Sequence, residues 1–346
     1  MLTSFSNKLK EYLFAHINVP RMPILKDVYE TLSSVKLLPI TEYSQMVKQA
    51  QSIKVESIYL PESIKYSVLQ LPIVTETRFN VGASSIILSS YSSKQEEIHN
   101  ESLVPFIQYM VSLFTHQNQK FHIRISLYLT SYKKTFPKTQ YLNKEDVNSG
   151  SCMNHNHNSC HIEIWRVEEL VKVLIHELIH GLQPKTLQDT PEVLQFYQKR
   201  YKISSSKVQI NEAYTELWAN IINCFIISYQ VKTSNLKLFK TLIAMEQLFS
   251  QIQATKVLNF KKQQSQSDLN KHTHVLAYFV IRCEMFQKLD SFLKHCKQKN
   301  PNYIILQNTS FWEEWFLSLK PVQPRKQKIP PDFQKTLRMS AIEMKI

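Results

Sequence analysis

The stretch KVLIHELIHGL, residues Lys172–Leu182, decides the fold around it. Its apolar residues recur at helical spacing and predict a helix over 167–182. His176, Glu177 and His180 interrupt this apolar segment. Because residues four apart lie on one face of a helix, the two histidines can bind one metal ion, and Glu177 leans toward the same site. Glu177 can then hold a metal-activated water without being a ligand itself.

The pattern His-Glu-x-x-His is only suggestive when taken alone. A chain of 346 residues with 12 histidines would contain it by chance at odds of roughly a few per cent. The alternative is a core helix with two partly satisfied histidines. Against that alternative, an ionised Glu177 without a counter-charge would cost on the order of several kcal/mol in apolar surroundings or be forced neutral. Whether the sequence contains a third ligand must therefore decide between a metal site and a core helix.

A second apolar segment supplies two carboxylates. The stretch INEAYTELWANIINCFII, residues Ile210–Ile227, lies in a predicted helix over about 208–229, where Glu212 and Glu216 stand four residues apart. A catalytic zinc takes three protein ligands and a water, so Glu212 is the candidate third ligand. Glu216, one turn further on, would accept the outer N–H of a ligating histidine. The alternative is two exposed glutamates on a solvent face.

The two segments together resemble the thermolysin-like, gluzincin family of zinc metallopeptidases. The motif at 176–180 is followed by Asn211-Glu212-x-x-Thr215-Glu216, where the family has Asn-Glu-x-x-Ser-Asp. The longer acid changes the geometry around the ligands, and the connection from the second histidine is longer than the family usually has. The resemblance covers roughly residues 160–227. It implies one zinc ion, Glu177 as the general base, and Asn211 and Glu216 as residues that support the ligands.

The same stretch, with VNSG at Val147–Gly150, also resembles uncharacterised metallopeptidases encoded by large nucleocytoplasmic DNA viruses. That resemblance suggests a viral protein and implies no substrate.

A further histidine stands just ahead of an apolar helix in HTHVLAYFVIRCEMF, residues His272–Phe286. Thermolysin-like enzymes place the histidine that stabilises the oxyanion in a similar context. The resemblance therefore implies His274 as a second catalytic residue. An ordinary histidine at a helix start remains equally open, and Tyr214 or Tyr278 could donate instead.

The order of predicted elements indicates an α+β fold. Strands are predicted at 84–91, 121–130 and 160–166, the polar stretch between the last two is predicted as a loop, and helices follow. We expect a small N-terminal or central sheet with an edge strand packed on the HExxH helix, and then a mostly helical, zincin-like C-terminal half. By analogy with gluzincins, the strand at 160–166 is the edge strand to which an extended substrate adds.

Three regions are expected along the chain. They are an N-terminal α/β region over 1–118, a zincin-like metallopeptidase domain over 119–320 and a basic C-terminal tail over 321–346.

Charge and cysteine content limit the partners. The net charge of +14 is compatible with a nucleic-acid partner, but no motif indicates one, and solubility explains the charge equally well.

Five cysteines make a disulfide framework unexpected, and the spacing in SCMNHNHNSCH matches no common zinc finger. The N-terminus has no signal-peptide core and no segment is long enough to span a bilayer. We expect an intracellular, cytoplasmic protein without a membrane partner, in the host cytoplasm if it is viral.

The sequence therefore predicts a zinc-dependent peptidase that uses a zinc-activated water and a glutamate general base. Its partner would be a protein or peptide substrate, with acidic proteins among the candidates. The alternative function is a basic, non-catalytic scaffold or nucleic-acid-associated protein that keeps a structural zinc.

Overall fold

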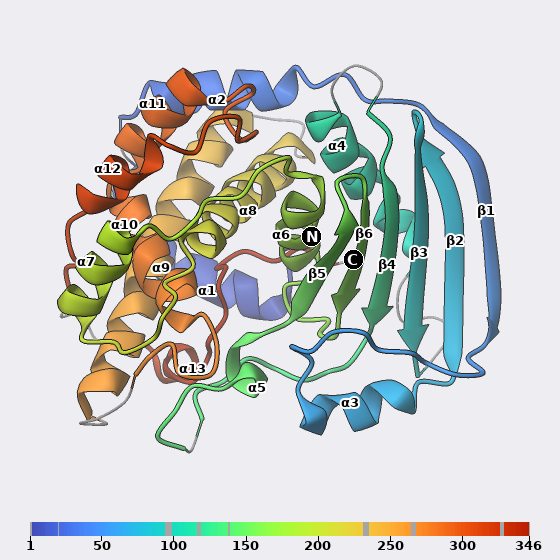
Figure 1. The fold of residues 1–346 in the computed structure, drawn as a ribbon, viewed down its shortest axis with the longest axis horizontal. Helices are drawn as coiled ribbons and strands as arrows, with labels where there is room; N and C mark the ends of the chain where they lie inside the picture. Colours follow the sequence, from blue (N-terminus) through green and yellow to red (C-terminus); the bar gives the residue numbers. More distant parts are fainter. Residues whose placement is uncertain are drawn as a thin grey trace. The chain divides into compact units, whose positions relative to one another are not determined.

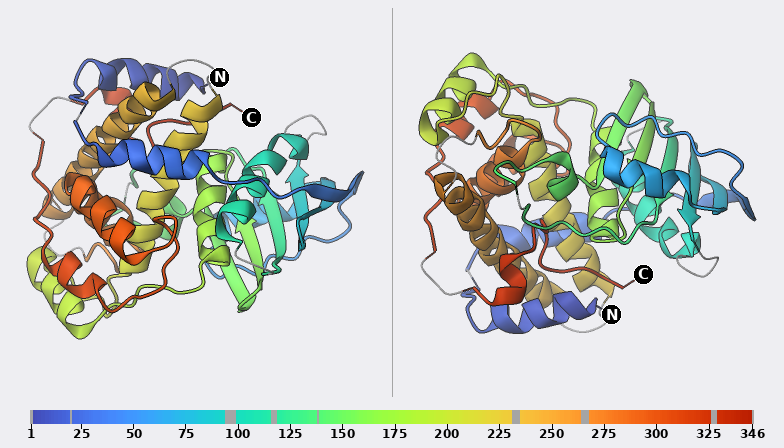
Figure 2. Two further views of the ribbon diagram at one scale, coloured as in Figure 1. Left: turned by 90° about the horizontal axis from the view of Figure 1, so that it is seen from above. Right: turned by 90° about the horizontal axis from the view of Figure 1, so that it is seen from below.

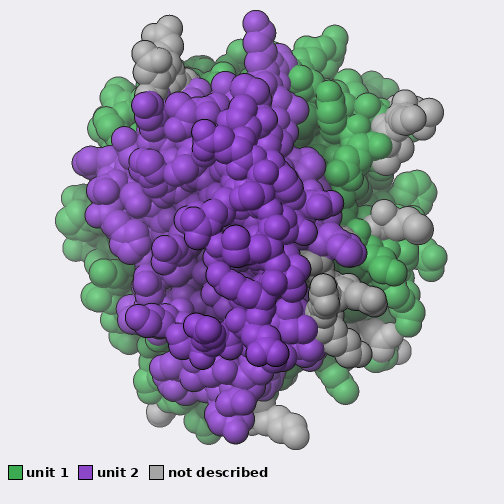
Figure 3. Space-filling model, turned by 90° about the vertical axis from the view of Figure 1, so that its right-hand side faces the viewer, with its two compact units in different colours: residues 1–33, 134–147, 184–345 green, residues 34–133, 148–183, 346 purple. Residues whose placement is uncertain are grey.

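The protein is α+β, with a six-stranded mixed sheet and many helices (Figure 1). The structure is a computed structural model, which describes residues 2–19, 21–93, 99–115, 119–137, 139–230, 235–263, 268–325 and 329–345. The chain divides into two compact units, coloured separately in Figure 3. Unit 1 contains residues 1–33, 134–147 and 184–345, and unit 2 contains residues 34–133 and 148–183. These units do not follow the expected boundaries at residues 118 and 320.

Unit 2 contains the sheet, whose strand order is β1-β2-β3-β4-β6-β5 (Figure 1). The three predicted strands are confirmed as β3 (Ser84–Ser92), β4 (His122–Tyr128) and β6 (Ser159–Ile164), and these three run parallel. The other three strands are antiparallel to their neighbours: β1 (Ile40–Gln49), β2 (Ile73–Val81) and β5 (Gly150–Asn156).

The edge strand beside the HExxH helix is β5, which corrects two expectations. The strand predicted to lie at the edge, β6, pairs with β4 on one side and with β5 on the other, so it is internal. Residues 150–156, predicted as loop, form β5 instead. These residues carry no apolar alternation, because an edge strand can expose polar side chains to solvent. The strand forms because the chain turns at His157 and Asn158 and pairs back onto β6.

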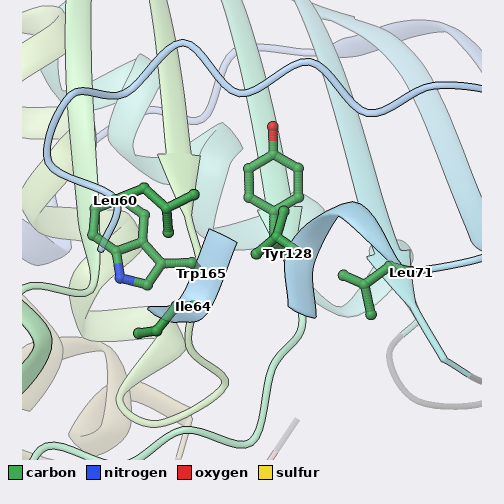
Figure 4. Packing of buried hydrophobic residues seen from close by; sticks show 6 residues of the cluster. Leu60, Ile64, Leu71, Tyr128 and Trp165 are labelled. Atoms are coloured by element: carbon green, nitrogen blue, oxygen red, sulfur yellow. The ribbon is translucent and has the colours of Figure 1, made fainter. Parts of the chain in front are cut away.

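The two faces of the sheet differ. One face presents buried apolar residues such as Ile86, Ile125 and Ile162, and helices α4 (Val104–Phe114) and α6 (Leu170–Leu182) pack on it (Figure 2). The other face is covered at one end by α3 (Glu62–Leu69). There, one hydrophobic cluster joins the helix and its flanks to the sheet (Figure 4): Leu60, Ile64, Val68, Leu71, Tyr128 and Trp165.

Unit 1 is helical, as expected for the C-terminal half. Its longest helices are α8 (Ile210–Gln230) and α9 (Asn235–Gln263). The apolar helix predicted just after His274 is divided into a π-helix, η2 (Leu276–Ile281), followed by α10 and α11. The remaining elements of this unit are short: α1 (Ser4–Phe14), α2 (Ile24–Ser33), α5 (Lys144–Val147), α7 (Pro191–Tyr201), α10 (Arg282–Gln287), α11 (Leu289–Lys299), α12 (Trp312–Leu317) and α13 (Pro331–Gln334). No described helix is long and apolar enough to cross a membrane.

The segment expected to be a basic tail is packed inside unit 1 over residues 336–342. Ser340 Oγ and the backbone N–H groups of Ala341 and Ile342 donate to the carboxylate of Glu246, which is buried on α9. The prediction of a tail rested on the basic residues of this segment, but its apolar residues Leu337, Met339 and Ile342 are buried in the core. Residues 326–328, in its basic run, lie outside the described residues.

Nearer its start, the chain is joined to this same segment. Leu2 forms an antiparallel bridge with Met344, and Thr3 donates its N–H to the carbonyl oxygen of Glu343 at 3.0 Å. The N–H of Glu343 in turn donates to Ser6 Oγ at 2.9 Å. Helix α1 is therefore held by residues more than 300 positions later.

Burial of Glu246 predicts a pH dependence of stability. Burial raises the pKa of Glu246 from an ordinary 4.5 to about 7. The folded state keeps the Glu246 proton at a higher pH than the unfolded state does. Protonated Glu246 therefore contributes its full stabilisation of the folded state below pH 4.5, and this contribution is lost as the pH rises through 7. At about 1.4 kcal/mol per pKa unit, the contribution is roughly 3 kcal/mol. Urea denaturation should show that the free energy of unfolding falls less between pH 5 and pH 7.5 in Glu246→Gln than in wild type. Equal losses would contradict the assignment.

Candidate metal centre

Helix α6 brings the two histidines of the HExxH motif together. His176 is buried and His180 is half-buried, one turn later. Their Nε2 atoms are 3.1 Å apart. Two nitrogens on one tetrahedral zinc, with bonds of about 2.0–2.1 Å, would be separated by about 3.3 Å. The helix therefore presents the two imidazoles at nearly the spacing that joint metal coordination requires.

The third predicted ligand, Glu212, lies on the first turn of α8, whose start is held by Asp189. The carboxylate of Asp189 accepts hydrogen bonds from the N–H groups of Val208, Gln209 and Ile210 at 2.7, 2.8 and 3.0 Å. These bonds satisfy backbone donors at the start of the helix and fix its position two residues before Glu212. Asp189 was not recognised from the sequence, because a single aspartate in a loop carries no distinctive signal.

Asn211 was predicted to support the ligands, and that role stays a prediction; the structure shows what its side chain contacts. Its Oδ1 accepts a hydrogen bond from the N–H of Leu187 at 3.0 Å. This bond attaches the start of α8 to the connection that follows α6. Both anchors, at residues 208–210 and at Asn211, immediately precede Glu212 in the sequence.

His176, His180 and Glu212 form a group that could hold a metal ion. One ligand atom from each of the three lies within 4.8 Å of the others. Two imidazoles and one carboxylate are a ligand set typical of a catalytic zinc, which keeps a fourth position for water. In the part of the chain that the structure describes, no other His, Cys, Asp or Glu side chains form such a group.

Glu177 lies against the first residue of the edge strand. Its side chain is buried, and a Cβ built on Gly150 would be 2.9 Å from its Oε1. That space exists because residue 150 has no side chain. The carboxylate thus lies on the same helix as the two histidines, beside the backbone of β5. Its role as a general base stays a prediction.

Glu216 has a partner that the sequence did not predict. It was expected to accept the N–H of a ligating histidine, and this bond stays a prediction. The structure shows instead that Arg282 Nη1 donates to Glu216 Oε1 at 3.0 Å, with both side chains buried. Arg282 Nη1 also contacts Asn220 Oδ1 and the carbonyl oxygen of Met339. The sequence signal for Arg282 is a single arginine within the apolar run HVLAYFVIRCEMF.

The structure narrows the candidates for oxyanion stabilisation. Tyr214 is fully buried, its hydroxyl donates to the carbonyl oxygen of Ile304 at 2.7 Å, and burial raises its pKa well above 10. We therefore remove Tyr214 from the candidates. His274 and Tyr278 are half-buried, and their rings lie 6.1 Å apart beside the π-helix η2. Their catalytic roles stay predictions.

Gly181, next to His180, gives room to two cysteines. A Cβ built on Gly181 would lie 2.6 Å from Cys160 Sγ and 3.3 Å from Cys152 Sγ. We expect Gly181→Ala to lower the free energy of unfolding by about 1–3 kcal/mol through overpacking. The double variant Gly181→Ala/Cys160→Ala should recover part of that loss. Urea denaturation of both variants and of Cys160→Ala measures the coupling, and additive effects would contradict the proposed clash.

Comparison with family models, curated proteins and solved structures gives no match for this chain.

Proposed function

We propose that the protein is a zinc-dependent peptidase of the gluzincin type. The observation that carries the proposal is the group of His176, His180 and Glu212, whose ligand atoms lie within 4.8 Å of one another. A buried glutamate, Glu177, lies between the two histidines in sequence. Two neutral nitrogen donors and one carboxylate fit zinc and leave room for a water molecule.

A zinc ion held there would make a water molecule more acidic and polarise a peptide carbonyl. Glu177 would take the proton from that water and pass it to the leaving amine. His274 would donate to the carbonyl oxygen, where negative charge develops.

The substrate would bind along β5. This strand is the edge of the sheet, and its only strand partner in the described sheet is β6. Its outer backbone groups could therefore pair with an extended peptide, as in other cases of strand addition. This moves the role that the sequence suggested for residues 160–166 to residues 150–156. Main-chain pairing of this kind suits a substrate of variable sequence, with side-chain pockets providing selectivity.

Metal analysis tests the first step of this proposal. Purified wild-type protein should contain about one zinc per chain. Glu212→Ala should lower zinc affinity by about two orders of magnitude, because the third ligand is lost. Glu192→Ala, at an exposed position on α7, is the matched control and should bind zinc as wild type does. A wild-type chain without stoichiometric zinc would end the proposal.

Cleavage must then be shown separately from metal binding. The zinc-loaded chain should produce new N-termini in a cell extract, and zinc-loaded Glu177→Gln should not. If zinc is bound but no protein is cleaved, while nucleic acid binds with a steep dependence on salt, the non-catalytic alternative is correct instead.

A further inference from the structure

A second polar site lies on the opposite face of the sheet from α6. It is a pocket of about 370 Å³ near the beginnings of the three parallel strands β3, β4 and β6. All of its lining residues belong to unit 2. They are mostly polar: Glu56, Ser85, Ile87, His122, Ile123, Arg124, His155, Ser159, Cys160 and His161. A volume of this size suits a small ligand.

The register of the sheet explains why these side chains gather. Ser85 pairs with His122, which pairs with Ser159, so the three form one row across the strands. Arg124 and His161 form the next row. Because alternate residues of a strand face the same side, both rows point away from α6. Ser85 Oγ and His122 Nδ1 are 2.7 Å apart, so the first row is also joined by a hydrogen bond.

An irregularity in β5 adds a third histidine. The register between β5 and β6 shifts between Asn154 and Asn156, so the intervening His155 has no directly opposite residue. A bulge of this kind redirects a side chain, here toward the face that carries His161. His155 and Arg124 are both close enough to Glu56 to help lower the pKa of that carboxyl, after the larger effect of its hydrogen bond with His161.

The wall of the pocket is built rigidly. His161 Nδ1 lies 3.1 Å from Glu56 Oε2, and its Nε2 lies 3.0 Å from Ser126 Oγ. The buried carboxylate of Glu163 accepts the backbone N–H groups of Glu56 and Ser57 at 3.1 and 2.7 Å. Glu56 is therefore fixed at the rim by its own backbone and by His161.

This Ser-His-Glu series has the distances of a hydrolase triad, but its position does not fit one. Ser126 is buried and is not among the residues that line the pocket. Both nitrogens of His161 already have partners, so they hold the wall in place. The groups that can meet a ligand are the exposed side chains of Arg124, His122 and His155 and the hydroxyls of Ser85 and Ser159.

We propose that this pocket binds a phosphate monoester. A guanidinium, imidazole N–H groups and hydroxyls come from β3, β4, β5 and β6, so donors can surround a tetrahedral oxyanion from several directions. Glu56 at the rim would repel a polyanion such as a nucleic acid backbone, and it could accept a hydrogen bond from a hydroxyl of the ester's organic part. A cation is disfavoured, since no described His, Cys, Asp or Glu residues in the pocket form a metal-binding group.

Isothermal titration calorimetry of the whole chain with phenyl phosphate and with inorganic phosphate, at constant ionic strength, tests this proposal. We expect saturable binding of phenyl phosphate, and binding at least tenfold weaker in Arg124→Gln and in His155→Ala. Arg21→Gln is the matched control, because Arg21 is an exposed arginine of unit 1, whereas every residue that lines the pocket belongs to unit 2. It should bind as wild type does. Comparison of the two ligands separates an ester site from a site for free phosphate.

The proposal would be overturned by no saturable binding by wild type, by an equal loss of binding in Arg21→Gln, or by equal binding of acetate. A stronger response to RNA than to the monoester, lost in the same variants, would also overturn it. Glu177→Gln and zinc removal should leave phenyl phosphate binding unchanged, so failure here and failure of the peptidase proposal are distinguishable. Unchanged circular dichroism of Arg124→Gln would show that the variant folds.

Discussion

Glu177→Gln should retain stoichiometric zinc and lose peptidase activity by about a thousandfold or more in kcat/KM. Glutamine has nearly the same shape as glutamate, so the space beside Gly150 would still be filled in the same way. An amide cannot accept a proton at neutral pH, and loss of a general base costs roughly a hundredfold to ten-thousandfold. Zinc should remain because Glu177 does not belong to the ligand group.

The measurement is cleavage of a substrate found by comparing new N-termini, together with zinc content for each preparation. Glu192→Gln, at an exposed position on α7, controls for the change of charge. If the Glu177→Gln protein cleaves at more than a tenth of the wild-type rate with full zinc, Glu177 is not the base. If it loses zinc as well, the residue has a structural role that the proposed mechanism does not include.

Arg282→Met should lower the free energy of unfolding by about 3–5 kcal/mol, because it leaves the buried Glu216 carboxylate without its cationic partner. The effect should be larger than that of most core substitutions, since Arg282 also contacts Asn220 and the carbonyl oxygen of Met339. Urea denaturation of zinc-free protein is the appropriate measurement, because bound metal would add its own stabilisation.

The double variant Arg282→Met/Glu216→Gln provides the control. Removing both charges should be less damaging than the sum of the single changes, because no buried charge then remains unpaired. Arg78→Met, at an exposed ion pair on β2, should change stability by less than about 1 kcal/mol. A loss below about 1 kcal/mol for Arg282→Met would show that Glu216 is neutral or compensated in another way.

Hydrophobic periodicity made part of the sheet predictable from the sequence, but β2 was not predicted although buried residues alternate along most of it. The strands at 84–92, 122–128 and 159–164 alternate or carry β-branched residues, and they were found. Strand β1 was missed because its side chains are exposed on both faces, so burial left no pattern in it. Strand β5 was missed because its polar residues depend on pairing with β6.

The site shows the same division between local and long-range information. His176, Glu177 and His180 were accessible because helical spacing alone places them together. Glu212 could be predicted as a ligand only from a second segment and from the resemblance of the two segments to gluzincins. Arg282 could not be found, because its meaning depends on a carboxylate 66 positions earlier in the chain.

The bonds between residues 2–6 and residues 343–344 determine when the chain can finish folding. On the ribosome, helix α1 emerges before the backbone groups that hold it, which are synthesised more than 300 residues later. Closing so long a loop carries an entropy cost that grows only with the logarithm of its length. The consequence is therefore one of timing more than of stability: α1 can pack against α9 earlier, but the backbone bonds at its start form only after synthesis has passed residue 344.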